Sequence, residues 1–197
     1  MDKQNVTAVI LAGGRGRRMG GLDKGLIDFA GKPMIEHILA AITPQCDAVI
    51  INANRNVERY IAYDHPVLTD ELNDYQGPLA GFAIALEHAT TPLIVTVPCD
   101  APVIPNDLVN RLFSTMQSSN ADIAVAHDGD RLQPVYALIK KELTTSLKEF
   151  LDSGDRKIDR WYALNRTVYA DFSDIPQIFQ NINTPEQQNL LHKEAIA

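Results

Sequence analysis

The segment from Gly13 to Lys24 gathers the residue types needed to hold a polyphosphate. It contains five glycines, three arginines and one lysine within twelve residues. Glycines let the backbone point several N–H groups at one anion, and arginine and lysine side chains bind phosphate oxygens directly. From Arg15 to Lys24 the local charge is +3, although the whole chain carries −7. This contrast indicates a site for an anionic small molecule and argues against a general nucleic-acid binder.

The spacing within this loop fits neither of two familiar phosphate-binding motifs. A Walker A loop requires GxxxxGK[ST], but Leu22 follows the glycine pair Gly16 and Gly21. The dinucleotide-binding fingerprint requires GxGxxG, but the sixth position counted from Gly14 is Met19. A P-loop ATPase and a dinucleotide-binding dehydrogenase are therefore disfavoured.

Asp100 is the candidate metal ligand. It ends the segment Pro98-Cys99-Asp100, directly after an apolar run over residues 93–97. A carboxylate placed at the end of a buried strand is a suitable ligand for Mg²⁺, which takes hard oxygen ligands and completes its shell with phosphates and water. The alternative for Asp100 is a turn or a helix cap.

No nucleophile of a hydrolase is recognisable. The histidines form no triad pattern, and no serine lies in a GxSxG motif. Cys46 and Cys99 are 53 positions apart and no CxxC is present, so we expect two buried apolar side chains rather than a disulfide or a zinc site. Trp161 and Tyr162 are expected to be packing residues rather than ligand platforms.

The elements that must position these residues alternate along the chain. Apolar runs predict buried strands at 6–11, 48–51 and 93–97, and further strands at 66–68, 121–126, 133–139 and 167–172. Helical periodicity and start signals predict helices at 33–42, 56–62, 78–88, 106–117, 142–151 and 184–192. Asp128-Gly129 predicts a hairpin turn, and therefore an antiparallel element. Strands alternating with helices predict an α/β fold with a mostly parallel sheet covered on both faces.

In such folds ligands bind at the carboxyl ends of the strands. Gly13 and Gly14, Asn52, Asp70 and Asp100 all follow predicted strands. This coincidence predicts one site at that edge of the sheet.

The bulk properties suit one domain spanning residues 1–197. The chain is 45% hydrophobic and 22% charged, which is ordinary for a globular protein. Its apolar runs are too short to cross a bilayer, and its first residues lack a secretory signal pattern. We therefore expect a cytoplasmic protein with no membrane partner.

The stretch LAGGRGRRMGGLDKGL resembles the LAGG-x-x-x-R-M-G-G-x-D-K signature of the molybdenum cofactor guanylyltransferases. These belong to the nucleotide-diphospho-sugar transferases. Further matching segments are residues 31–33, 52–55, 70, 77–81, 98–102 and 181–185. The resemblance spans nearly the whole chain and is least diagnostic between 133 and 172.

The resemblance implies a Rossmann-like three-layer sandwich and a Mg²⁺-dependent transfer of GMP from GTP to the terminal phosphate of Mo-molybdopterin. Its implied nucleotide contacts are Leu11, Ala12, Gly13, Gly14, Arg15, Lys24, Asn52, Asp70, Gly81 and Asp100. Its implied catalytic residues are Asp100, Lys24 and Arg18, with Asp100 also holding the metal. Asn181 and Asn183 would place the acceptor. Other cofactor biosynthesis proteins and apo-molybdoenzymes are the implied protein partners.

Several alternatives stay open. Asp70 could be a solvated loop carboxylate, and Asn183 could cap the final predicted helix. The enzyme could use CTP on the same cofactor, or act on a sugar 1-phosphate. It could also be a non-catalytic GTP-binding or carrier subunit, or a purely structural domain.

Overall fold

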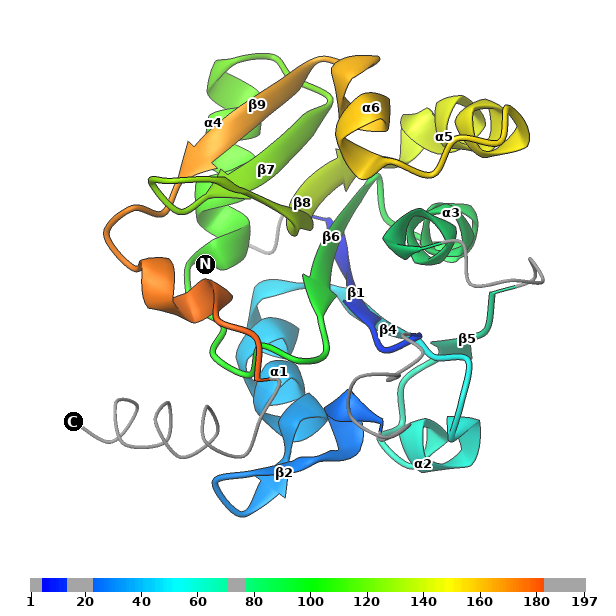
Figure 1. Ribbon diagram of the computed structural model, residues 1–197, viewed down its shortest axis with the longest axis vertical. Coiled ribbons are helices and arrows are strands. Elements are labelled where there is room, and N and C mark those ends of the chain that lie inside the picture. Colours follow the sequence, from blue (N-terminus) through cyan, green and yellow to red (C-terminus); the bar gives the residue numbers. More distant parts are fainter. Residues whose placement is uncertain (1–4, 14–22, 71–76, 183–197) are drawn as a thin grey trace.

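The computed structural model describes residues 5–13, 23–70 and 77–182. Within these residues a seven-stranded sheet has the order β5-β4-β1-β6-β8-β7-β9 (Figure 1). The strands are β1 Val6–Leu11, β4 Ala48–Asn52, β5 Val67–Leu68, β6 Leu93–Pro98, β7 Ile123–His127, β8 Leu132–Lys140 and β9 Thr167–Asp171. Neighbouring strands are parallel from β5 to β6 and between β7 and β9, whereas β8 is antiparallel to both of its neighbours.

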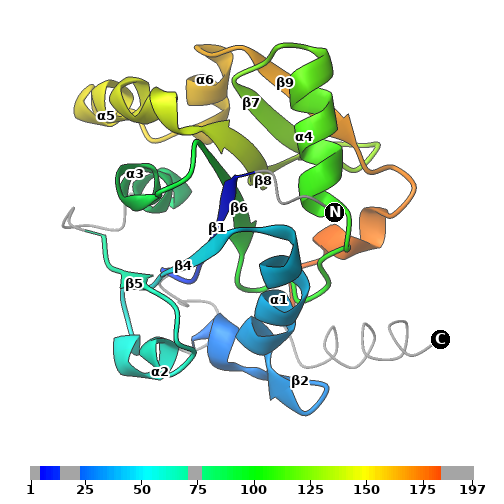
Figure 2. The same ribbon diagram turned by 180° about the vertical axis from the view of Figure 1, so that it is seen from behind.

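Helices cover both faces of the sheet (Figures 1 and 2). One face packs against α1 Met34–Ile42, α2 Val57–Ile61 and α4 Leu108–Ser118. The other packs against α3 Pro78–His88, α5 Thr144–Asp152 and α6 Ile158–Ala163. Side chains of β1 alternate between the two cores, with Ala8 and Ile10 in the first and Val9 in the second, as a strand buried on both faces requires.

The predicted three-layer α/β fold, its mostly parallel sheet and its antiparallel hairpin are confirmed. Most predicted elements lie within two residues of their predicted bounds. Cys46 and Cys99 are buried, and Trp161 and Tyr162 belong to the second core, as expected. The predicted helix at 184–192 lies outside the described residues.

Some predicted helices begin later than expected, and some short elements were not predicted. The first helix begins at Met34 because Pro33 belongs to a small hairpin, β2 Asp28–Phe29 and β3 Lys32–Pro33. The helix expected from 142 begins at Thr144, after the 3₁₀ turn η4 Lys141–Leu143. Helix α6 was not predicted. Elements as short as this hairpin and α6 contain too few residues to reveal a hydrophobic period.

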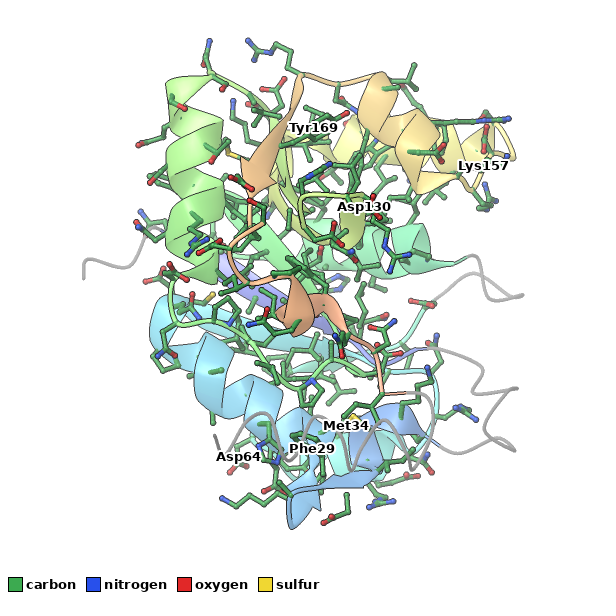
Figure 3. All side chains as sticks on the ribbon, turned by 60° about the vertical axis from the view of Figure 1, so that its left-hand side comes forward. Phe29, Met34, Asp64, Asp130, Lys157 and Tyr169 are labelled. Atoms are coloured by element: carbon green, nitrogen blue, oxygen red, sulfur yellow. The ribbon has the colours of Figure 1, made fainter. Side chains whose placement is uncertain are left out.

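The hairpin brings distant parts of the chain together. Phe29 and Met34 lie side by side at the N-terminal end of α1 (Figure 3), and Ile182 completes their buried cluster. The last described residues therefore pack against the start of α1.

Parallel strands place their carboxyl ends at one edge of the sheet, and two hydrogen bonds continue the pairing beyond them. Ala12 N–H donates to the Asn52 carbonyl at 2.7 Å, and Cys99 N–H donates to the Leu11 carbonyl at 3.2 Å. The segments after β1, β4 and β6 thus stay side by side.

Within the described part of the chain, no helix combines the length and apolarity needed to cross a membrane.

Candidate active site

A cavity of about 380 Å³ opens at this carboxyl edge. It is lined by Leu11, Gly13, Asn52, Asp70, Gly77, Pro78, Pro98, Asp100, Val135 and Asn181. Leu11, Gly13, Asn52, Asp70, Asp100 and Asn181 were all predicted as site residues, and the structure brings them to one place. Ala12 is buried beneath them. Gly14, Arg15, Arg18 and Asn183 lie outside the described residues, so their predicted roles stay predictions.

A larger cavity of about 830 Å³ lies at the opposite edge of the sheet. Its lining includes Leu93 at the start of β6 and Lys140 at the end of β8. None of the predicted site residues lines it. The smaller cavity is therefore the candidate site, because it combines a carboxyl edge with the residues suited to the chemistry.

Asp70 is held in one orientation by two side-chain amides. Asn52 Nδ2 donates to Asp70 Oδ1 at 2.8 Å, and Asn54 Nδ2 donates to Asp70 Oδ2 at 2.7 Å. Asn54 Oδ1 also accepts the Asp70 backbone N–H at 2.8 Å. Each carboxylate oxygen keeps further acceptor capacity. Asp70 is therefore an oriented carboxylate at the cavity and not a freely solvated one.

Asn54 was missed as a site residue, although the Asn52-Ala53-Asn54-Arg55 segment had been recognised as a motif. The available signal was the spacing of the two asparagines. Residues two apart in an extended segment can lie on the same side of the chain. Here both reach the same carboxylate.

Gly81 has a packing role behind Asn52. A Cβ atom at this position would lie 2.6 Å from Asn52 Oδ1 and 2.6 Å from Leu11 Cδ2. Only a residue without a side chain allows α3 to approach the ends of β1 and β4 this closely. Gly81 thus supports the two lining residues from behind.

Lys24 and Asp100 form an ion pair at the β6 side of the cavity. Lys24 Nζ lies 2.7 Å from Asp100 Oδ2, and their side chains are 23% and 14% exposed. Lys24 begins the 3₁₀ turn η2 Lys24–Leu26, which follows directly on the predicted phosphate-binding loop. A cation and a carboxylate from segments 76 residues apart are therefore held together at the edge of the site.

The position of Lys24 is determined by its neighbours in sequence. The buried carboxylate of Asp23 accepts hydrogen bonds from Tyr60 Oη at 2.5 Å and from Asn56 Nδ2 at 3.0 Å. Burial raises the pKa of Tyr60, and its hydrogen bond to the Asp23 carboxylate raises it further, so the hydroxyl remains a donor. At Gly25, a Cβ atom would lie 2.6 Å from Tyr60 Oη. Asp23 and Tyr60 were not predicted, because nothing in the sequence pairs them.

Asn181 is tied to the Asp100 segment through the residue that follows it. Ile182 N–H donates to the Asp100 carbonyl at 2.8 Å, while its side chain is buried against Phe29 and Met34. Asn181 is exposed and lines the cavity beside Asp100. The predicted acceptor residue thus lies next to the predicted metal ligand.

Cys99 does not contribute a nucleophile. Burial raises the pKa of its thiol to about 12, and the negative charges of Asp100 and Asp23 act in the same direction. The thiol is therefore protonated at neutral pH and behaves as a small apolar side chain.

The donors at the site fit a magnesium ion held mainly by its nucleotide. Among the described residues, no group of three or more His, Cys, Asp and Glu side chains could hold a metal ion. Asp100 offers one carboxylate at the cavity wall. Mg²⁺ is commonly bound through one or two carboxylates, with phosphates and water completing its octahedron.

Comparisons with known proteins agree with this geometry. Residues 8–168 match the family model of the MobA-like NTP transferase domain. That match defines the class of the protein as a nucleotidyltransferase. Two relatives from Shewanella sediminis and Shewanella loihica, both named molybdenum cofactor guanylyltransferase, are 52% and 50% identical over 98% of this chain and 97% of their own length. The chain belongs to the molybdenum cofactor guanylyltransferases within the MobA-like family.

Solved structures support the fold. Molybdopterin-guanine dinucleotide biosynthesis protein A from Archaeoglobus fulgidus superposes with a TM-score of 0.78 at 22% identity, covering 96% of this chain and 98% of its own. A nucleotidyl transferase from Methanothermobacter superposes with a TM-score of 0.74 at 19% identity, covering 98% of both chains. At these identities the superpositions show a common fold.

Proposed function

We propose that this protein transfers GMP from GTP to the terminal phosphate of Mo-molybdopterin and releases pyrophosphate. An oxygen of the acceptor phosphate forms a bond to the α-phosphorus of GTP. The bond from that phosphorus to the oxygen bridging to the β-phosphate breaks, and its electron pair leaves with pyrophosphate. One observation carries the proposal. Asp70, an oriented carboxylate suited to guanine, and Asp100, which is paired with Lys24 and suited to a metal–triphosphate, line the same cavity.

Asp70 is the proposed reader of the base. Guanine presents N1–H and an exocyclic N2 amine on one edge, and a carboxylate can accept from both. Because Asn52 and Asn54 fix the two oxygens of Asp70, this acceptor pair is oriented before the nucleotide binds. The chain from Leu11 to Gly13 forms the adjoining wall for the nucleoside.

Lys24 and Asp100 are the proposed groups at the triphosphate. Mg²⁺, when bound, supplies positive charge that offsets the repulsion between the two phosphates and stabilises the leaving pyrophosphate. Asp100 would hold it. Lys24 can exchange part of its contact with Asp100 for a triphosphate oxygen, and Gly14, Arg15 and Arg18 of the loop would add to this binding.

No general base is needed in this chemistry. The second pKa of a phosphomonoester is about 6, so the acceptor is already mostly ionised near neutral pH. Asn181, beside Asp100, and Asn183 would place that phosphate. The remaining task of the site is to bring two anions together, which is electrostatic and positional.

GTP and Mo-molybdopterin are thus the proposed substrates of a single nucleotidyltransferase domain. We further propose that it works in the cytoplasm alongside other cofactor biosynthesis proteins, and that apo-molybdoenzymes receive its product.

Comparing the thermal stabilisation of the protein by GTP, CTP, ATP and UTP, each with Mg²⁺, tests the base assignment. The largest shift is expected with GTP. A larger shift with CTP than with GTP would favour a cytidylyltransferase. A larger shift with UTP or ATP than with GTP would favour a sugar-1-phosphate nucleotidyltransferase.

Asp100→Ala tests the proposed metal ligand. We expect its turnover with GTP, Mg²⁺ and Mo-molybdopterin to fall at least about a hundredfold, since the developing charge loses its stabilising ion. GTP binding should survive in part, because the Asp70 side of the cavity is unchanged. Asp152→Ala, at the end of α5, removes a carboxylate outside the cavity and should behave like the wild type. Transfer at the wild-type rate by Asp100→Ala, with Mg²⁺ as the only added metal, would contradict the assignment.

A further inference from the structure

Strand β8 carries an irregularity directly beside the candidate site. Val125 of β7 pairs with Ala137, but the next residue, Ala126, pairs with Gln133. Pro134, Val135 and Tyr136 are therefore extra residues that bulge from β8. Bulges of this kind occur preferentially next to active sites, where they turn a side chain in a new direction.

The bulge is held in place from both sides. Thr96 Oγ1 of β6 donates to the Val135 carbonyl at 2.7 Å, and Tyr162 Oη of α6 donates to the Pro134 carbonyl at 2.6 Å. Val135 itself lines the cavity. The bulge is therefore a fixed part of the cavity wall, and the orientation of Tyr136 is fixed with it.

The Tyr136 hydroxyl is buried without a hydrogen-bond partner among the residues that the structure describes. The side chain is only 2% exposed, and its ring packs edge-on against Phe179 at 4.9 Å between centroids. The other tyrosine next to the bulge, Tyr162, has its hydroxyl satisfied. A buried polar atom without a partner costs free energy, and such atoms are rare in native structures. This hydroxyl therefore calls for a functional explanation.

The surroundings of Tyr136 place it beside Asp100. Ala137 pairs with Thr96 of β6, so Tyr136 lies alongside the segment that ends at Asp100. Phe179, which contacts its ring, lies two residues before Asn181. Burial raises the pKa of Tyr136, and the charge of Asp100 raises it further. Tyr136 thus lies near the segments that carry Asp100 and Asn181.

We propose that Tyr136 is a positioning residue for Asp100, and that its hydroxyl donates a hydrogen bond to the Asp100 carboxylate in the magnesium–nucleotide complex. The inference rests on the proposed function. When an anionic triphosphate enters, it competes with Asp100 for Lys24. The carboxylate then has acceptor capacity toward a second donor, and the Tyr136 hydroxyl is a donor with no other described partner. Hydrogen bonds to a metal-binding carboxylate orient it for the ion.

Tyr136→Phe removes the hydroxyl and nothing else. The melting temperature of the free protein should be unchanged or higher, because the lost hydroxyl has no partner there. The Mg²⁺ concentration that gives half of the GTP-induced thermal shift should rise about tenfold, as is typical when a group that orients a metal ligand is removed. Tyr63→Phe is the matched control, because its hydroxyl donates to Glu36 at 3.3 Å and lies outside the cavity. Its Mg²⁺ titration should match the wild type.

Two results would overturn the proposal. One is a Mg²⁺ titration of Tyr136→Phe within twofold of the wild type. The other is a clear loss of melting temperature in the free variant, which would mean that the hydroxyl has a structural partner. If the wild type itself shows no Mg²⁺-dependent shift with GTP, the proposed function fails as well. If the wild type shows the Mg²⁺-dependent shift and Tyr136→Phe shows the same Mg²⁺ dependence, only the proposed role of Tyr136 is contradicted.

A double-mutant comparison with Asp100→Asn provides a second measurement. If Tyr136 acts through the Asp100 carboxylate, adding Tyr136→Phe to Asp100→Asn should not weaken Mg²⁺-dependent GTP binding further. Independent, multiplying effects of the two substitutions would show that Tyr136 acts elsewhere.

Discussion

Asn52 and Asn54 each donate an amide N–H to a different oxygen of Asp70, while Asn54 also accepts the Asp70 backbone N–H. The arrangement explains how a carboxylate on an irregular segment can present a defined edge to a base. At the scale of single residues, selectivity for guanine then depends on the side-chain amide of Asn54. This amide acts by orienting Asp70 and need not contact the nucleotide itself.

Asn54→Ala should reduce this selectivity. Without its two hydrogen bonds to Asn54, Asp70 is held by Asn52 alone and is less well oriented, so the affinity for GTP should fall about tenfold, the equivalent of one net hydrogen bond to a charged group. Binding of ATP should change little. Calorimetric titration with both nucleotides and Mg²⁺ measures the ratio. Asn165→Ala, which removes an amide bound to the Trp161 carbonyl, is the control. Equal weakening of GTP and ATP binding would contradict a role in base selection.

Gly81→Ala should affect both stability and binding. Alanine favours a helix over glycine by about 1 kcal/mol, but its Cβ would lie 2.6 Å from atoms of Asn52 and Leu11. Overpacking of this kind costs about 1–3 kcal/mol, so we expect a net loss in the free energy of unfolding by urea and weaker GTP binding. Ala83→Gly on the same helix should cost stability while GTP binding stays normal. A more stable Gly81→Ala variant with normal GTP binding would show that the helix does not need this close approach.

The sequence identified residues with distinctive chemistry more easily than their supports. Lys24 and Asp100 could be predicted because a cationic glycine-rich loop and a carboxylate after an apolar strand each have local meaning. The roles of Asp23, Tyr60 and Tyr136 could not. Asp23 and Tyr60 meet only after η2 and α2 pack together, and Tyr136 is turned inward by a bulge that no local pattern reveals.

At the scale of elements, the edge of the sheet opposite the site is fixed by Asp122. Its carboxylate accepts from Lys140 at the end of β8 at 2.8 Å and from Arg166, just before β9, at 2.8 and 2.7 Å. Three strands are thereby joined at one point. The Arg166 guanidinium lowers the pKa of Asp122 to about 2, with Lys140 acting in the same direction.

Asp122→Asn should therefore lower stability in a pH-dependent way. Because the folded pKa lies below the unfolded value, the stabilisation is complete above pH about 4 and is lost as the pH falls through about 2. Allowing for the exposure of Arg166, we expect a loss of about 1–2 kcal/mol at pH 7 and about half of that at pH 3. Urea unfolding at both pH values measures it. GTP binding should be unaffected, and an equal loss at both pH values would contradict the ionic origin.

At the scale of the whole molecule, the alternation of strands and helices was sufficient to predict the layered fold and the edge that carries the site. It could not give the strand order, in which β8 separates β6 from β7. That insertion places the bulge of β8 next to Asp100. The architecture thus brings together a base-reading side, from β4 and the segment after β5, and a charged side, from Asp100 after β6 and Lys24 of η2.

The most direct test of the account is product formation by the purified protein. It is incubated with Mg²⁺, Mo-molybdopterin and either GTP or CTP, and the dinucleotide cofactor and pyrophosphate are then quantified. The account predicts the guanine dinucleotide and pyrophosphate in equal amounts from GTP, and little product from CTP. Binding of GTP without either product, or preferential use of CTP, would contradict it.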